Sequence, residues 1–313
     1  MGESGYQEKG DWRQKGEGML KKIKKDRVLY LMMAPGFVYF LLFHVWPIFE
    51  MKLAFYDYRI MGDDIFVGWK HFKTLFSTPA FFGIIKNTLV ISFMKIVLFF
   101  PFPVAFALAL NEMRTRRFRK AVQVVSYLPH FLSWVVIAGI WYEFLSPSNG
   151  LVMDIVALFG GERRNLLTDK NSILWVLFAS STWRSMGWDS IIYLSAILGI
   201  DTALYEAAKM DGAGRWKTIR YIILPALAGP MVTVLILNVG FVMSAGYDQI
   251  LNFSNDAVLS RVDILDTYVY RIGLLQGQYS FATAANLFKG VIGTAMILLT
   301  HFTSKKLTGK GAW

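Results

Sequence analysis

Long apolar stretches alternate with short polar ones along most of this 313-residue chain. An α-helix rises about 1.5 Å per residue, so about 20 apolar residues in a row can cross the hydrocarbon core of a membrane. The stretches of this length predict an all-α, polytopic membrane protein with six transmembrane helices. They cover residues 28–49, 84–110, 121–145, 172–200, 226–247 and 281–303.

Basic residues gather near both ends of the chain and after the second and fourth apolar stretches. Cytoplasmic loops are enriched in lysine and arginine, so these clusters predict that both termini lie in the cytoplasm. The connections 50–83, 146–171 and 248–280 are longer and less basic, and should lie outside the membrane. The basic residues are Lys21, Lys22, Lys24, Lys25 and Arg27; Arg114, Arg116, Arg117, Arg119 and Lys120; Lys209, Arg215, Lys217 and Arg220; and Lys305, Lys306 and Lys310.

Three parts follow from these boundaries: a basic cytoplasmic segment at 1–27, a six-helix domain at 28–303 that includes a cytoplasmic loop at 201–225, and a cytoplasmic tail at 304–313. No small-residue cleavage site follows the first apolar stretch, so we expect it to remain as a helix. Prolines inside the predicted helices remove backbone donors and should kink or break them. These are Pro35, Pro47, Pro101 and Pro103.

The composition agrees with a membrane location, because 55% of the residues are hydrophobic and 18% are charged. The formal net charge of +11 is spread over short clusters rather than one continuous face, so we expect membrane lipid and no nucleic acid as a partner. There is no cysteine, and His44, His71, His130 and His301 form no pair one helical turn apart. The chain also lacks a P-loop and a Gly-x-Ser-x-Gly elbow, so we expect no catalysis, metal or cofactor.

The segment between the fourth and fifth stretches predicts a short helix outside the bilayer. Asp201 or Thr202 can cap its start, residues 203–210 are mostly good helix formers, and Gly212 and Gly214 can end it. A helix this short is not stable alone in water, so it should dock against something. Leu204, Ala207 and Ala208 share a face at helical spacing and form a small apolar ridge, with Glu206 and Lys209 pointing elsewhere. Pro225 should mark the start of the next spanning helix.

Glu206-Ala207-Ala208, Gly212, Ile222 and Leu224-Pro225 together resemble the EAA loop of binding-protein-dependent importer permeases. Further likenesses are Ala34-Pro-Gly36, Phe66-Val-Gly68 with Phe72 and Leu75-Phe76, Asn87-Thr88-Leu89, and Gly187-Trp188. They extend over nearly the whole chain and resemble maltose-type carbohydrate permeases, most closely a bacterial group associated with complex polysaccharides or uronate oligosaccharides. Thr202 stands where that group commonly has proline, and both residues suit a helix start.

The resemblance implies the type I ABC importer permease fold, in the bacterial cytoplasmic membrane. It also implies four kinds of partner: a second similar permease, two ATP-hydrolysing subunits that bind ATP and magnesium, an extracytoplasmic sugar-binding protein, and an oligosaccharide substrate. In the family, the EAA helix sits in a cleft of the ATPase subunit. The residues expected to couple this chain to the ATPase are Leu204, Glu206, Ala207, Ala208, Asp211 and Gly212.

Arg184 lies near the middle of the fourth apolar stretch, where a charge facing lipid would cost at least about 2.5–3.5 kcal/mol. At helical spacing Ser180, Arg184 and Trp188 share a face, while Asp189 points elsewhere. Arginine can bind a carboxylate and tryptophan can stack on a sugar, so Ser180, Arg184, Trp188 and Asp189 are candidates for the substrate pathway. Lys95 and Lys289 could add to a cationic interior. Alternatively, Arg184 pairs with an acid of the second permease.

The external segment 150–159 has apolar residues at the spacing of an amphipathic helix, namely Leu151, Val152, Ile155, Val156 and Phe159. It could, with 248–280, receive the sugar-binding protein, or it could simply pack on the rim of the bundle. Alternative functions remain open at this stage. An importer permease for another solute would share the coupling loop, whereas a secondary transporter would carry intramembrane carboxylates beyond Asp189.

Reporter fusions test the predicted orientation. Fusions at Asn149 and Asn255 should report an external location, and fusions at Arg117 and Gly214 a cytoplasmic one, because the basic clusters lie on the latter side. Activity of a periplasmic reporter such as alkaline phosphatase measures the external state. The reverse result at either pair of positions contradicts the predicted orientation.

Overall fold

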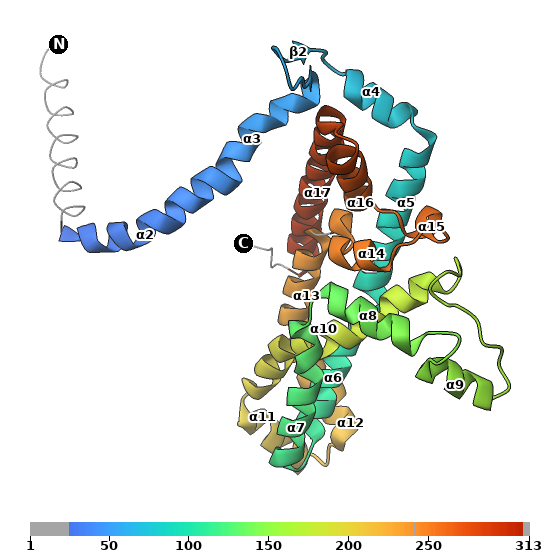
Figure 1. The fold of residues 1–313 in the computed structure, drawn as a ribbon. Helices are drawn as coiled ribbons and strands as arrows, with labels where there is room; N and C mark the ends of the chain where they lie inside the picture. The colour runs from blue at the N-terminus through green and yellow to red at the C-terminus, as the bar shows by residue number, and fades with distance from the viewer. Residues whose placement is uncertain (1–24, 241, 309–313) are drawn as a thin grey trace, which may run out of the picture. The chain divides into compact units, whose positions relative to one another are not determined.

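A computed structural model describes residues 25–240 and 242–308 (Figure 1). Most of the basic segment predicted at 1–27, and the end of the tail predicted at 304–313, lie outside the described residues. The described part is almost entirely helical. Its elements are α2 (Arg27–Phe40), η1 (Leu41–Val45), α3 (Trp46–Glu50), η2 (Met51–Phe55), β1 (Tyr56–Asp57), β2 (Ile65–Phe66), α4 (Lys70–Ser77), α5 (Pro79–Phe93), η3 (Met94–Leu98), α6 (Pro101–Glu112), α7 (Arg116–Tyr127), η4 (Leu128–Phe131), α8 (Trp134–Phe144), α9 (Leu151–Leu158), α10 (Ile173–Leu198), α11 (Thr202–Met210), α12 (Arg215–Thr218), η5 (Ile219–Ile223), α13 (Leu224–Gly240), η6 (Val242–Ser244), α14 (Tyr247–Phe253), α15 (Leu259–Val262), α16 (Leu265–Val269), η7 (Tyr270–Leu275) and α17 (Tyr279–Thr308).

Four continuous helices of the described residues are long and apolar enough to cross a membrane: Arg27–Phe55, Pro79–Glu112, Arg215–Gly240 and Tyr279–Thr303. The number rises to six when each of two bent helix pairs is counted as one span, in agreement with the predicted six. The first helix belongs to a unit that ends at Leu53, and the other elements form a second unit from Ala54. No side chain of α2 is buried, as expected for a helix that lipid or another chain surrounds.

The third predicted span is not one straight helix. Its two halves, Arg116–Phe131 and Trp134–Phe144, meet at an angle of 107°. Pro129 lies in the 3₁₀ turn η4 just before the bend, and Ser133 caps α8 by accepting a hydrogen bond from the Val136 amide. A proline followed by a new N-cap ends one helix and starts another. The apolar stretch predicted at 121–145 therefore forms a bent pair of helices rather than a straight one.

Three prolines, of which Pro47 and Pro101 were predicted to kink or break their helices, lie in helices that continue through them. A π-helical turn precedes Pro47, another precedes Pro101 and a third precedes Pro225, and each helix continues through its proline. Proline cannot donate to the carbonyl four residues earlier, and the wider π turn shifts the hydrogen-bond register there. Pro225 also does not begin the fifth helix as predicted, because that helix starts at Arg215.

The second unit is built around α10, which has 26 residues and so is long enough, at about 39 Å, to cross a membrane. Its side chains pack between α6, α7 and α13. One apolar cluster joins α6, α10 and α13 through Ala107, Tyr193 and Leu227. A second joins α4, α5, α16 and α17 through Leu75, Phe81 and Ala285.

Gly187 is the point of closest approach between α10 and α7. A Cβ at this position would lie 2.3 Å from the Ser126 carbonyl oxygen, which belongs to the backbone and cannot rotate away. Small residues allow helices in membranes to approach this closely. The glycine noted in the family likeness thus has a packing reason in this fold.

Gly187→Ala should therefore destabilise the protein by about 1–3 kcal/mol, because the added methyl group overpacks the contact with Ser126. The matched control is Gly139→Ala in α8, where a Cβ meets nothing within 4 Å. Alanine is the better helix former, so the control should leave stability unchanged or raise it. Thermal unfolding of the purified protein measures both variants, and equal stability of the two would contradict the close contact.

Candidate functional site

The predicted coupling helix forms as α11 (Thr202–Met210). The Asp201 side chain caps it by accepting a hydrogen bond from the Ala203 amide at 2.9 Å. At the other end Gly212 has a φ of +70°, and the Ala213 amide donates to the Ala208 carbonyl at 2.8 Å. This left-handed glycine closes the helix end. The local sequence thus sets both ends of the helix.

The outward face of α11 differs in part from the predicted ridge. Leu204, Glu206 and Ala207 are exposed, as are Asp211 and Gly212 after the helix. Ala208 is half-buried, because it lies on the side of the helix that faces the bundle, next to Tyr205. The three-residue ridge of Leu204, Ala207 and Ala208 is therefore incomplete as an exposed surface.

Two exposed apolar residues, at the end of α11 and in α12, were not predicted. Met210 is 88% exposed and Trp216 is 78% exposed. Both are large apolar residues in a loop predicted to lie outside the bilayer, and this could have marked them as additional contact residues.

Packing and charge attach α11 and α12 to the end of the bundle where α6 ends and α7 begins (Figure 1). Tyr205 packs against the cluster that contains Leu110 and Ile197. Arg215, at the start of α12, donates to the Glu112 carboxylate at the end of α6, with its Nε 2.6 Å and its Nη2 2.5 Å from Oε2. Two nitrogens of the Arg215 guanidinium thus meet the same carboxylate oxygen of Glu112.

Arg119 fixes the turn between α6 and α7 at the same end. Its Nη2 donates to the Asn111 carbonyl at 3.2 Å and to the Met113 carbonyl at 2.8 Å. These are among the last carbonyls of α6, which have no partner within the helix. The ends of α6, α7 and α12 are therefore joined by two arginines.

The candidate pathway residues on α10 make three different sets of contacts. The guanidinium of Arg184 lies 4.9 Å from the Trp134 ring centroid, and its Nε is 3.5 Å from the Leu132 carbonyl, at the bend of the third span. Trp188 stacks on His130 with centroids 4.4 Å apart and an interplanar angle of 5°. Arg184 and Trp188 thus share a face, as predicted, and that face meets the bend.

Ser180, one helical turn before Arg184, has a different partner. It is fully buried, and its hydroxyl oxygen accepts a hydrogen bond from Gln249 Nε2 of α14 at 2.8 Å. Gln249 also donates to the Leu177 carbonyl at 2.7 Å. Ser180 therefore joins α10 to α14.

Asp189 lines a separate cavity of about 190 Å³ between α6, α10 and α13. Its polar neighbours there include Lys95, Ser185 and Asn238, of which Ser185 and Asn238 were not predicted. Lys95 donates to the Ala245 carbonyl at 2.7 Å, and Ser92 donates to the Val242 carbonyl. No local sequence pattern predicts that Asn238 lies near Asp189. The two residues meet only because α10 and α13 pack together in the tertiary fold.

The segment that carries α15, α16 and η7 is held by buried polar contacts. Asn87 donates to the carbonyls of Ser260 and Asp263 at 3.1 and 3.2 Å, and Thr88 accepts from the Leu265 amide at 3.0 Å. Arg271 pairs with Asp263 at 2.5 Å. The residues of the Asn87-Thr88-Leu89 likeness therefore position this segment.

Lys289 pairs with Asp266 at 2.6 Å, and both side chains are largely buried. A neighbouring carboxylate cancels its charge, so Lys289 does not supply a free cation to the interior. The β1–β2 hairpin is joined to α4 by Lys70, which donates to Asp57 at 2.6 Å. This hydrogen bond lowers the pKa of Asp57.

No group of three metal-ligating side chains occurs within residues 25–240 and 242–308. The site geometry instead consists of an exposed short helix at one end of the bundle and polar residues around α10. Residues 100–303 match the family of the binding-protein-dependent transport system inner membrane component. The chain belongs to this family. Its members are transport subunits of ABC importers, which confirms the predicted permease fold and the prediction that the chain is not an enzyme.

Similar proteins support the same assignment over almost the whole permease. The polygalacturonan/rhamnogalacturonan transport system permease protein YteP of Bacillus subtilis is 40% identical over 96% of this chain and 95% of its own length. Protein LplB of the same organism is 35% identical over 95% of this chain and 94% of its own. A chain in a crystal structure of a bacterial ABC transporter involved in the import of the acidic polysaccharide alginate is 36% identical, with a TM-score of 0.86 over 93% of this permease and 99% of that chain.

The pair of Glu112 and Arg215 predicts a charge-exchange result. Each single reversal, Glu112→Arg or Arg215→Glu, places two like charges together and loosens the attachment of α12 to α6. Uptake should fall by about fivefold, which corresponds to a loss of about 1 kcal/mol of coupling free energy between the ATPase and the permease. The double exchange should recover uptake, because the ion pair reforms with its signs reversed. Assembly should survive, since exposed pairs contribute about 0–1 kcal/mol to stability.

Lys217→Glu is the matched control, because Lys217 is exposed in the same short helix. It should transport normally. Uptake and ATPase activity are measured on the same membranes, so loss of transport with ATPase activity retained identifies a coupling defect. Failure of the double exchange to exceed either single variant would show that the pair does not act as a unit.

Proposed function

We propose that this permease forms half of the pathway by which a uronate-containing oligosaccharide enters a bacterial cell. The observation that carries the proposal is the similarity over nearly the full length to a permease of an alginate importer. The name of the 40%-identical relative also refers to polygalacturonan, a polymer of an acidic sugar. Two well-covered relatives therefore handle polymers with carboxylate groups, which favours an acidic oligosaccharide over a neutral one.

The proposed complex contains this permease, a second similar permease, two ATPase subunits and an external sugar-binding protein. A related alginate transporter has been crystallised with an alginate pentasaccharide-bound periplasmic protein, and its permease is 37% identical to this one. We place both termini and α11 in the cytoplasm, because the basic clusters lie on that side of the predicted spans. The ATP and magnesium belong to the partner subunits.

Coupling is assigned to the exposed face of α11. Leu204, Glu206 and Ala207 supply a mixed apolar and acidic surface, and Asp211 and Gly212 extend it past the helix end. A rigid body can transmit movement only if it is fixed to the rest of the protein. The contacts of Tyr205 with the apolar cluster and of Arg215 with Glu112 supply that attachment.

The opposite end of the permease is the proposed surface for the binding protein. In α9, Val152 and Val156 pack against the core, while Leu151 and, directly after the helix, Phe159 are exposed. The η7 turn exposes Leu274 and Leu275 close to the residues that Asp263 and Arg271 hold in place. An exposed apolar surface at a fixed position suits a transient partner.

Arg184 is the proposed contact for the substrate carboxylate. It is half-buried in the middle of α10, beside Trp134 and one turn from Trp188, so a planar cation lies next to aromatic surfaces. Carboxylates bind guanidinium groups in two-point contacts, and sugar rings pack on aromatic faces. The alternative is that Arg184 pairs with an acid of the second permease.

The function is tested by uptake in a deletion strain complemented with this gene. The complemented strain should accumulate oligogalacturonate or oligoalginate, measured by mass spectrometry, and the deletion strain should not. Uptake of neutral oligosaccharides alone would contradict the acidic substrate while keeping the importer function. The absence of any oligosaccharide uptake would favour an importer for another solute.

Arg184→Gln should abolish uptake of the acidic oligosaccharide and leave the complex assembled. Arg184→Lys is the matched control, because it keeps the positive charge and should retain part of the uptake. Size-exclusion chromatography of the purified complex reports assembly. Dissociation of the Arg184→Gln complex would instead assign the residue to the permease interface, and normal acidic-sugar uptake would remove it from the pathway.

A further inference from the structure

An apolar groove of about 480 Å³ lies between α6, α7 and α10. Phe106 comes from α6, and Trp183 and Met186 come from α10. The remaining lining residues belong to α7 and the turn that follows it, namely Phe118, Ala121, Val122, Val125, Ser126 and Pro129. These positions recur at the three- and four-residue spacing of one helix face, so the groove runs along α7.

The groove offers almost no hydrogen-bonding group to an occupant. Ser126 is the polar residue of its lining, and the Ser126 hydroxyl already donates to the Val122 carbonyl of its own helix at 2.7 Å. A sugar or an extended peptide placed there would leave its polar groups unpaired. The groove therefore suits a hydrocarbon chain.

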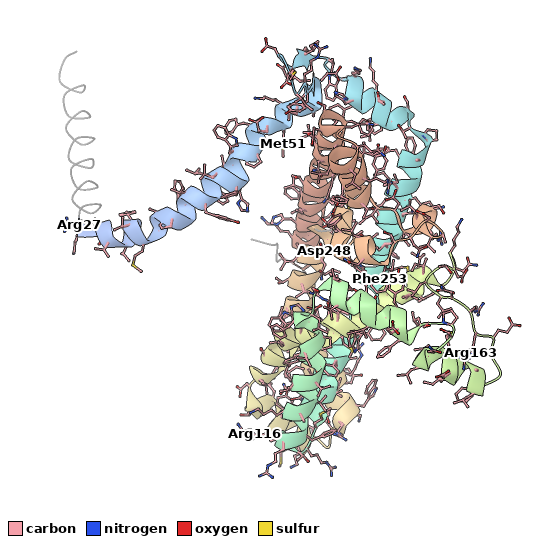
Figure 2. The ribbon with its side chains drawn as sticks, viewed as in Figure 1. Arg27, Met51, Arg116, Arg163, Asp248 and Phe253 are labelled. Carbon is pink, nitrogen blue, oxygen red and sulfur yellow. The ribbon has the colours of Figure 1, made fainter. Side chains whose placement is uncertain are left out.

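Basic side chains lie where the groove reaches the end of the bundle. Arg117 precedes Ala121 by one helical turn, and Arg114 lies in the connection that leads into α7. Both are exposed. Figure 2 shows Arg116 of the same turn at the end of the bundle that Figure 1 assigns to α11 and α12. Arg114, Arg116 and Arg117 all lie where α7 begins, and arginine clusters at the cytoplasmic side of a membrane attract anionic headgroups.

We propose that this groove binds one acyl chain of an anionic phospholipid, whose phosphate is held by Arg114 and Arg117. The apolar lining takes the chain and the two guanidinium groups take the headgroup, so both ends of the ligand are matched by charge and polarity. The contact of Gly187 with Ser126 brings α7 and α10 together at the groove and gives it a fixed width. The site does not depend on which solute the permease transports.

The test compares lipids retained by the purified complex, measured by native mass spectrometry after exchange into phosphatidylglycerol or phosphatidylcholine. Wild type should retain phosphatidylglycerol in preference. The double variant Arg114→Gln/Arg117→Gln should lower the retention of phosphatidylglycerol by about thirtyfold, because each basic residue near an anionic headgroup contributes about fivefold to binding. The matched control is Arg116→Gln/Lys120→Gln, which removes the same charge from the opposite face of α7 and should bind normally.

A second variant, Ala121→Trp, fills the groove and should displace the chain while leaving the arginines in place. If this variant does not fold, the comparison of the two glutamine pairs decides the result. Equal retention of both lipids, or equal loss in both glutamine pairs, would overturn the proposal. Separation of the two permeases in the Ala121→Trp complex would also overturn it, because the groove would then hold a helix of the second permease.

Discussion

Every backbone amide and carbonyl within a membrane must find a partner in the protein, because the hydrocarbon core offers none. This constraint explains how the chain uses its prolines. The helices that contain Pro47, Pro101 and Pro225 stay continuous, each with a π-helical turn just before the proline. A wider turn changes which carbonyl each amide meets, so that the missing donor does not break the helix.

Where the helix does break, side chains from a neighbouring span take over. After α13 the chain turns through Ala245 and Gly246, which have φ values of 46° and 85°. Ser92 and Lys95 donate to the carbonyls of Val242 and Ala245, and both come from the second span. Lys95, within an apolar stretch, thus supplies a donor to a backbone carbonyl at this turn, a role that its sequence position alone does not indicate.

Features set by a short stretch of sequence were predictable. The ends of α11 follow from Asp201 and Gly212, and the apolar stretches mark all six spans, although not their bends. Features that need two distant elements were not predictable: Ser180 accepts a hydrogen bond from Gln249, and Lys289 pairs with Asp266. Helical spacing gives the direction of a side chain on its own helix, but the identity of the neighbouring helix comes from packing. The bend after Pro129 has a local signal, namely the proline and the N-cap residue Ser133. Both lie within an apolar stretch, so the stretch alone predicts a single span.

The turn at Gly246 has an evolutionary consequence. The ammonium of Lys95 lies 2.3 Å from the place where a Cβ at position 246 would stand, so the two positions compete for one volume. A larger residue at 246 is tolerated only after the side chain at 95 has become shorter, and a shorter side chain at 95 leaves the Ala245 carbonyl without its donor. Either substitution alone is harmful, whichever comes first. Positions 95 and 246 should therefore show strong epistasis and change together among descendants of this chain, although about 150 residues separate them in the sequence.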